Sequence, residues 1–163
     1  MKKLHVLAAA AVIGAMSMSV QADSQWSLNY GTVDFDGDAT PSAIDARYQM
    51  NVTDMFDVEF VLGFGIGDDD GAEVASRYGL AGVYTHEFSD GFDGFVTLGY
   101  NSVEVDVDNV FGTFSADDAG IGYGLGVNYD LGSGFVTARY ESIVDGDDLE
   151  AVTGMSIGYG MSL

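Results

Sequence analysis

The chain of 163 residues lacks cysteine, has one proline and carries very few basic residues. Without cysteine, no disulfide bond can stabilise the fold. Lysine occurs only at Lys2 and Lys3, and the rest of the chain carries three arginines, Arg47, Arg77 and Arg139, against 26 acidic residues. The net charge from residue 23 onward is therefore −23. A segment of this charge repels nucleic acid, which we exclude as a partner.

Residues 1–22 have the pattern of a signal peptide. Lys2 and Lys3 precede the apolar run LAAAAVIGAM, and small residues end the segment at Ala22. The apolar run is too short to cross a membrane as a helix. We therefore predict export with cleavage after Ala22, which leaves residues 23–163 as one domain.

Beyond residue 22 the dominant pattern is a period of two, in which large apolar residues alternate with small or polar ones. This period is typical of β-strands with two different faces, and no segment here shows a helical period. The segments average roughly nine to eleven residues, the length that a tilted strand needs to cross a bilayer. The segments are 26–33, 43–52, 56–67, 74–88, 95–100, 119–129, 135–142 and 154–163. The alternation of the fifth segment drifts near Asn101.

The connections between these segments fall into two classes. Those at 51–55, 89–94 and 130–134 are short. The other four are longer and hold 16 of the 26 acids: 34–42, 67–73, 104–118 and 144–150. With an even number of strands, all long connections lie at one end. Short turns at one end and longer loops at the other are typical of an outer-membrane barrel.

Alternation alone leaves two folds open, because a soluble lipocalin-like barrel also alternates, with its apolar face inward. Here the polar face has no lysine and is rich in small residues, which suit the narrow interior of an eight-stranded barrel. All three arginines lie on this face with carboxylates near them. We predict that they fill the lumen as one polar network: Asp45, Arg47, Glu59, Arg77, Arg139 and Glu141.

Aromatic residues gather where the segments meet the short turns, as in the girdle at a membrane interface. The predicted girdle is Trp26, Phe56, Phe88, Phe92, Phe95, Tyr129 and Phe135. A closed barrel also leaves no unpaired backbone edge in lipid. We therefore predict an all-β fold, an eight-stranded antiparallel up-and-down transmembrane β-barrel with lipid on its apolar face.

Residues 23–163 resemble the small eight-stranded outer-membrane barrels of Gram-negative bacteria, the OmpA/OmpX-like class. The signal peptide, the eight amphipathic segments and the closing MSIGYGMSL carry the resemblance. It implies that the barrel-assembly machinery reads the alternating apolar residues of the last strand as an assembly signal: Met155, Ile157, Tyr159, Met161 and Leu163. That class usually ends on Phe, whereas Leu163 stands at the end here.

The sequence offers little for catalysis, and we predict neither enzymatic activity nor a cofactor. His86 is the one histidine after residue 22, and its pattern favours a girdle residue with a polar tip over a catalytic base. The acidic run DFDGDA has its glycine at the fourth position, where a calcium-binding EF-hand loop needs it at the sixth. A looser hypothesis remains, in which loop carboxylates and lipopolysaccharide phosphates share divalent cations.

We predict a monomer in the cell outer membrane with a structural and surface-interaction role, in contact with lipid, lipopolysaccharide and the barrel-assembly machinery. The alternative is a narrow, cation-preferring channel through the lumen. Glycines on one inner strand favour this alternative by leaving room for water: Gly120, Gly122, Gly124 and Gly126. Val110, Phe111 and Phe114 form an apolar island in the longest acidic loop, either as a cover for the barrel mouth or as a contact for a partner.

Overall fold

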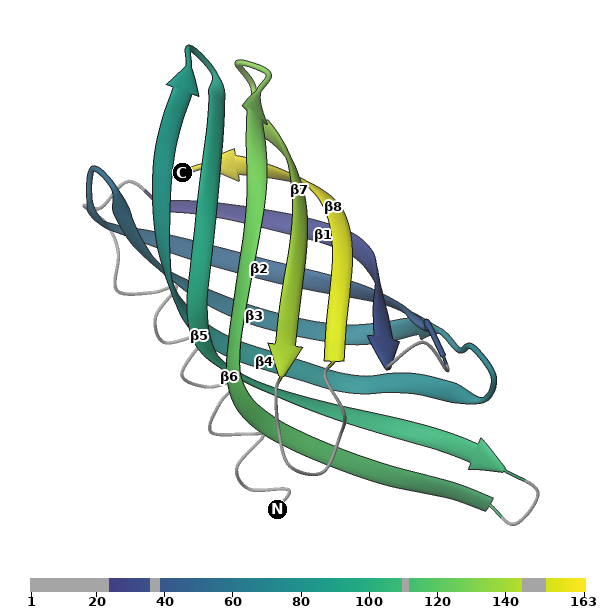
Figure 1. Ribbon diagram of the computed structural model, residues 1–163. Helices are drawn as coiled ribbons and strands as arrows, with labels where there is room; N and C mark the ends of the chain where they lie inside the picture. Colours follow the sequence, from purple (N-terminus) through teal and green to yellow (C-terminus); the bar gives the residue numbers. More distant parts are fainter. Residues whose placement is uncertain (1–23, 36–38, 110–111, 145–151) are drawn as a thin grey trace.

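A computed structural model describes residues 24–35, 39–109, 112–144 and 152–163, which form one closed antiparallel β-barrel (Figure 1). The strands are β1 (Ser24–Phe35), β2 (Ser42–Thr53), β3 (Phe56–Gly67), β4 (Ala72–Ser89), β5 (Phe92–Asn109), β6 (Gly112–Asp130), β7 (Phe135–Val144) and β8 (Val152–Ser162). The prediction of an eight-stranded up-and-down barrel is confirmed. Among the described residues, no helix is long and apolar enough to cross a membrane.

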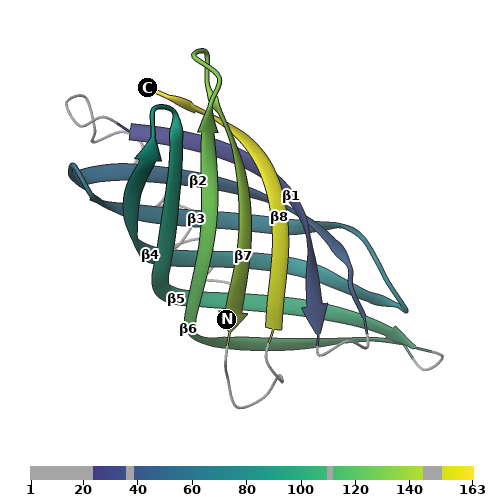
Figure 2. The ribbon, with the colours of Figure 1, turned by 45° about the horizontal axis from the view of Figure 1, so that its top comes forward.

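Each strand pairs with its neighbours in sequence, and β8 closes the barrel onto β1. The ladder extends to the end of the chain, where the Leu163 amide donates to the Ser24 carbonyl at 2.7 Å. In Figure 2, β6, β7 and β8 cross in front of β1–β4 at a steep angle, as tilted strands of a barrel do. We call the end with Ser24, Leu163 and the connections 54–55, 90–91 and 131–134 the turn end, and the opposite end the loop end.

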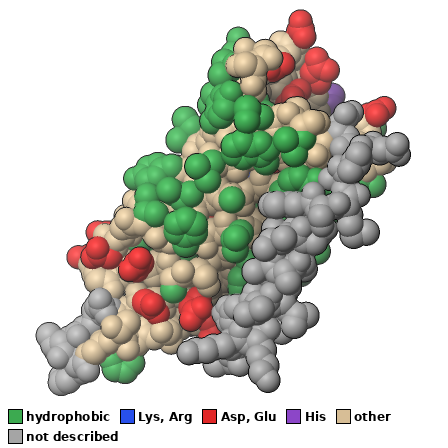
Figure 3. Space-filling view, turned by 180° about the vertical axis from the view of Figure 1, so that it is seen from behind, with side chains coloured by type: hydrophobic (Ala, Val, Ile, Leu, Met, Phe, Trp, Pro, Cys, Tyr) green, Lys and Arg blue, Asp and Glu red, His purple; other side chains and the backbone are tan. Residues whose placement is uncertain are grey.

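The outer surface is apolar around the middle of the barrel. In Figure 3, hydrophobic side chains cover the middle of the visible face, and acidic side chains gather toward both ends. On the loop side, a hydroxyl residue follows the last large apolar residue on the outer face of six strands. These residues are Thr32, Ser42, Ser76, Ser102, Ser142 and Thr153. Two pairs of them are cross-strand partners: Thr32 with Ser42, and Ser142 with Thr153. They mark one boundary of the apolar belt.

The drift of the fifth segment has a physical cause. On β5, Leu98 and Tyr100 are exposed on the outer face, whereas Val103 and Val105 are buried on the inner face. The pairing of β5 with β6 has no register shift, so the strand continues regularly while its polarity inverts at Ser102. The apolar belt ends at this residue.

Two of the four predicted long loops, 67–73 and 104–118, are wrong. Residues 104–109 and 112–118 continue β5 and β6 as a hairpin that extends past the other strands at the loop end (Figure 1). Between β3 and β4, Asp69 and Ala72 exchange two backbone hydrogen bonds of 3.0 and 2.9 Å around a two-residue turn. Asp70 and Gly71 both have positive φ there, as an Asp-Gly hairpin turn requires. Between β3 and β4, turn chemistry rather than loop acidity therefore decides the length of the connection.

We call the projecting part of the sheet the surface ribbon: residues 72–76 of β4, 102–109 of β5 and 112–119 of β6. Its pairs alternate between an acidic and an apolar side, since Glu73 is paired with Asp106 and Val74 with Val105. Phe114 is exposed and lies opposite Val107. The other two members of the predicted apolar island, residues 110 and 111, lie outside the described residues.

The predicted aromatic girdle needs two corrections. Trp26, Phe56, Phe88 and Tyr129 are exposed on the outer face at the turn end. Phe95, however, is buried, and Phe135 lies on the same side of β7 as Arg139, so both rings belong to the lumen. Both residues lie near the turn end of their strands, as the prediction requires, but at positions whose side chains point to the inner face.

Candidate functional site: the barrel lumen

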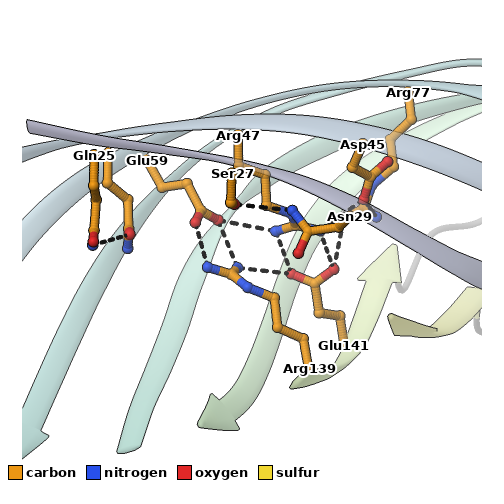
Figure 4. A network of polar contacts seen from close by, with 10 residues as sticks. Gln25, Ser27, Asn29, Asp45, Arg47, Glu59, Arg77, Arg139 and Glu141 are labelled. Atoms are coloured by element: carbon orange, nitrogen blue, oxygen red, sulfur yellow. Dashed lines mark hydrogen bonds and ion pairs between the residues drawn. The ribbon is translucent and has the colours of Figure 1, made fainter. Parts of the chain in front are cut away.

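The lumen contains a network of charged side chains at its centre. The structure brings all six predicted residues together, from β2, β3, β4 and β7 (Figure 4). The side chain of each is at most 11% exposed. Three guanidinium groups face three carboxylates, so the network as a whole is neutral, which is the condition under which buried charges are tolerated.

Arg47 is the hub of this network. Its two terminal nitrogens donate to both oxygens of Glu141 at 2.8 and 2.6 Å, a bidentate pair. The same nitrogens also donate to Asp45 at 2.8 Å and to Glu59 at 3.0 Å. Arg47 lies on β2 and Glu141 on β7, so this pair crosses the lumen from one wall to the opposite one.

The other two arginines complete the cross-links. Arg77 donates to Asp45 at 2.8 Å and to Glu141 at 2.9 Å. Arg139 binds both oxygens of Glu59 at 2.9 and 2.5 Å, whereas its distance to Glu141 is 3.6 Å. The partner that sequence proximity suggests for Arg139, Glu141, is therefore its weakest one, whereas Arg47 does bind the carboxylate two residues away on its own strand, Asp45.

The interior glycines do not leave room for water as the sequence suggests. A Cβ at Gly126 would collide with the Phe95 ring, and one at Gly124 would meet Thr97 and Glu141. The Arg139 guanidinium lies 4.4 Å from the centre of the same Phe95 ring, a cation–π contact that the sequence did not reveal. Small residues thus make space for large ones on neighbouring strands, as in other narrow barrels.

Toward the loop end, the lumen is filled by an apolar cluster that the sequence interpretation missed. Its core consists of side chains from β1, β2, β4, β5, β7 and β8 and of Ala39 from the β1–β2 connection, with Phe35 packed against them: Val33, Ala39, Ala43, Ala72, Val74, Val103, Val105, Ile143, Val144 and Val152. Beside the charged network, two cavities of about 10 Å³ each are found, enough for roughly one water molecule apiece. The charged network and the apolar cluster therefore fill two successive sections of the lumen with described side chains.

Toward the turn end, the lumen widens into a polar vestibule. A cavity of about 470 Å³ lies there, lined by Gln25, Asn51, Asn128 and Phe135 among others. Four carboxylates also line it: Asp54, Asp57, Asp93 and Asp130. The vestibule has the charge to admit cations, but it ends below the charged network.

Known proteins share the fold of this barrel. A family model described as the outer membrane protein beta-barrel domain matches residues 8–162. The chain belongs to this family. No curated protein sequence matches it.

Solved structures of other outer-membrane barrels show the same fold. The N-terminal β-barrel domain of Pseudomonas aeruginosa OprF is 13% identical, with a TM-score of 0.64 over 86% of this chain and 100% of that one. Ail, the attachment invasion locus protein of Yersinia pestis, solved in complex with the heparin analogue sucrose octasulfate, is 17% identical, with a TM-score of 0.62 over 88% and 100%. Neisserial surface protein A is 14% identical, with a TM-score of 0.58 over 86% and 95%. At these identities the likeness concerns the fold alone.

The remaining predicted site residues of this outer-membrane barrel lie outside the lumen. The alternating apolar residues of β8 are exposed on the outer face: Met155, Ile157, Tyr159, Met161 and the terminal Leu163. The predicted cleavage residue, Ala22, lies outside the described residues. His86 is exposed on the outer face and packs edge-on against Phe88, with 5.2 Å between ring centres. Its imidazole therefore faces the interface and not a polar pocket.

Proposed function

We propose that this protein is a non-conducting outer-membrane barrel with a structural and surface-interaction role. The observation that carries the proposal is the filled lumen, in which a neutral network of cross-wall ion pairs lies on the turn side of a buried apolar cluster. Such an interior makes a rigid support for the surface ribbon. In this proposal the ribbon and its acidic connections, not the lumen, meet other molecules.

The proposed orientation places the loop end outside the cell. Both Ser24 and Leu163 lie at the turn end, where the connections are short, and short turns in outer-membrane barrels are periplasmic. Because the chain has no cysteine, single-cysteine variants test this directly. We expect a membrane-impermeant maleimide to label Ser115→Cys on intact cells, and Asp90→Cys only after the outer membrane is permeabilised. The reverse pattern would overturn the orientation.

Single-channel recording tests the closed lumen. The protein is refolded into lipid, its folding is verified by heat-dependent gel mobility, and current is recorded in a planar bilayer. We expect no reproducible current steps from the native chain. We expect none from Arg77→Ala either, because this change leaves the apolar cluster above the network in place. Regular steps from native protein of proven folding would refute the proposal.

The second candidate is the narrow cation-preferring channel, and the acidic vestibule favours it. In that function the charged network would open as a gate or filter, as alternative pairing among three arginines and three carboxylates permits. Cation-selective steps in the same recording, altered by Arg77→Ala, would support this candidate. The two functions therefore predict opposite results in one experiment.

Export and assembly complete the proposal. We infer that residues 1–22 are removed after Ala22 and that the barrel-assembly machinery reads the outer face of β8 up to Leu163. The mass of the protein extracted from outer membranes tests the first inference. For the second, Leu163→Asp places a charge at the end of the apolar row. We expect it to lower the amount of folded barrel in cells while leaving refolding into detergent intact.

We also propose that the protein is monomeric and is not an enzyme. In this proposal divalent cations bind only where loop carboxylates and lipopolysaccharide phosphates share them. Among the described residues, no group of three His, Asp or Glu side chains is placed to hold a metal ion, which supports loose rather than specific binding. Calcium titration of the folded protein by calorimetry, without and with lipopolysaccharide, tests this. Tight binding to the protein alone would contradict it.

A further inference from the structure

The surface ribbon has one edge that no described strand covers. β6 pairs with β5 along its whole length, but it pairs with β7 only from Tyr123 to Asp130. The loop-end part of β6 therefore has a neighbour on one side alone among the described strands (Figure 1). The Ala119 amide already donates to the Asp118 carboxylate at 2.7 Å. We call residues 112–117, which are all exposed, the ribbon edge.

The ribbon edge is suited to strand addition. The edge of a sheet presents a row of backbone N–H and C=O groups, with which an extended segment of another molecule can pair. Residues 112–117 span about 20 Å, enough for a segment of similar length. Affinity in this mode comes from the backbone, whereas specificity comes from the side chains on the two sides of the strand.

One side of the ribbon edge is apolar. Phe114 lies opposite Val107, and Ala116 lies opposite Val105. Phe114 is 57% exposed and Val107 is 38% exposed, so apolar area beside the edge remains in contact with water. A docked strand with apolar side chains on this side would cover part of that area.

The other side of the ribbon edge is acidic and has no cation of its own. Asp117 lies opposite Glu104, and Asp106 lies opposite Glu73. Like charges directly opposite each other destabilise a sheet. The described part of the chain has three basic residues, all arginines, and all three are bound within the lumen network. A cationic side chain that docks beside Asp117 would therefore meet uncompensated carboxylates.

These two sides decide the occupant. A second copy of this chain, paired edge to edge with its apolar side aligned, would also bring the two acidic sides together, and this repulsion disfavours it. A strand that alternates basic and apolar residues fits both sides at once. We propose that the ribbon edge binds such an extended segment of another protein by strand addition, an inference that deepens the surface role proposed above.

Peptide binding tests the proposal. The folded, purified barrel in detergent is titrated calorimetrically with a short, end-blocked peptide of alternating lysine and valine. We expect saturable binding, and we expect amide hydrogen exchange to slow at residues 112–117. A second peptide of the same composition carries its lysines in one block, so it has the same charge but no two-sided strand. We expect it to bind about tenfold more weakly or worse.

Two charge reversals locate the site. Asp117→Lys reverses a charge at the ribbon edge, and we expect it to weaken binding of the alternating peptide by about tenfold or more. Glu73→Lys is the matched control, because it makes the same change on the same side of the ribbon but on β4, two strands away. At this distance of about 10 Å salt screens the charge, and we expect an effect of about threefold or less.

Each other outcome counts against the proposal. Equal binding of the two peptides would replace strand addition by simple charge attraction, and unchanged exchange at residues 112–117 would remove the site from the ribbon edge. Equal weakening by Asp117→Lys and Glu73→Lys would do the same. If Asp117→Lys does not fold, the peptide comparison and the exchange measurement on the native chain decide. Failure of the proposed function is read separately, from the Ser115→Cys labelling and the single-channel recording.

Discussion

The two parts of β5 on either side of Ser102 have opposite polarity. Toward the turn end, Leu98 and Tyr100 face outward and are exposed, while toward the loop end Val103 and Val105 face inward and are buried. One regular strand thus meets lipid on its outer face in its first part and water on that face in its second. Hydrophobic alternation reports which solvent a face contacts, and it does not by itself identify the inside of a barrel.

The two interiors differ in the same way. Where the outer face meets lipid, the lumen is filled by paired charges such as Arg47 and Glu141; beyond the boundary it is filled by aliphatic side chains such as Ile143. The first interior depends on the balance of opposite charges, and the second depends on close packing. Substitutions can therefore separate the two parts by the kind and size of their effect.

The largest effect is expected from Arg47→Met. This change removes a cation bound to three carboxylates and leaves an uncompensated negative charge in the lumen. The expected loss in the free energy of unfolding is about 3–5 kcal/mol. Urea unfolding in lipid vesicles, followed by the fluorescence of the single tryptophan, Trp26, measures it.

The matched control restores neutrality. Arg47→Met combined with Glu141→Gln leaves two arginines opposite two carboxylates, and we expect it to recover a large part of the lost stability. If the double variant is less stable than Arg47→Met alone, the network is held by individual hydrogen bonds and not by charge balance.

A charge on the outer face of β5 compares the two solvents directly. Leu98→Arg places a cation in the lipid-facing part of the strand, where the cost is about 2–4 kcal/mol. Asp106→Arg places an arginine on the same face of β5, beyond Ser102. We expect it to change the free energy of unfolding by about 0.5 kcal/mol or less. Both variants are measured by the same urea unfolding. Equal costs at the two positions would show that the membrane boundary does not lie at Ser102.

The sequence predicts most of this fold, because strand period and length depend on local chemistry. The sequence also contains only three arginines, and all three alternate with apolar residues so that they fall on the polar face. A charged network within the lumen follows from these positions. Which arginine pairs with which carboxylate does not follow from the sequence. Glu141 binds Arg47 and Arg77 across the barrel, at sequence separations of 94 and 64 residues, and only closure and strand tilt bring them together.

The loop end could not be predicted for a different reason. A residue such as Val103 breaks the alternation of its segment, and a broken alternation is indistinguishable in sequence from the start of a loop. Phe95 shows the same limit at the turn end, where an aromatic residue near an interface is read as girdle although its parity is that of the lumen. In both cases the signal was the parity of one residue, which is clear only once the strand is known to continue.

An intermediate effect is expected where small and large side chains share space in the charged part of the lumen. Gly126→Ala forces the Phe95 ring away from its position and disturbs its contact with Arg139, at a cost of about 1–3 kcal/mol. Gly82→Ala is the control on the outer face, where the added methyl group meets only the Leu98 carbonyl oxygen, at 3.9 Å, and costs about 0.5 kcal/mol or less. If both changes cost the same, the lumen is loosely filled, and the channel candidate gains support.

The smallest effect tests whether the apolar cluster is packed as one unit. Ile143→Val deletes one methylene group from a fully buried side chain, and we expect a loss of about 0.5–1.5 kcal/mol in urea unfolding. Val103→Ile adds a methylene group to the same cluster and should also destabilise the barrel when made alone. The double variant conserves volume, so its cost should fall below the sum of the two single costs by about 0.5 kcal/mol or more. Strict additivity would mean that the two side chains do not share one packed space, and a wet, yielding loop end would then be the better description of this half of the lumen.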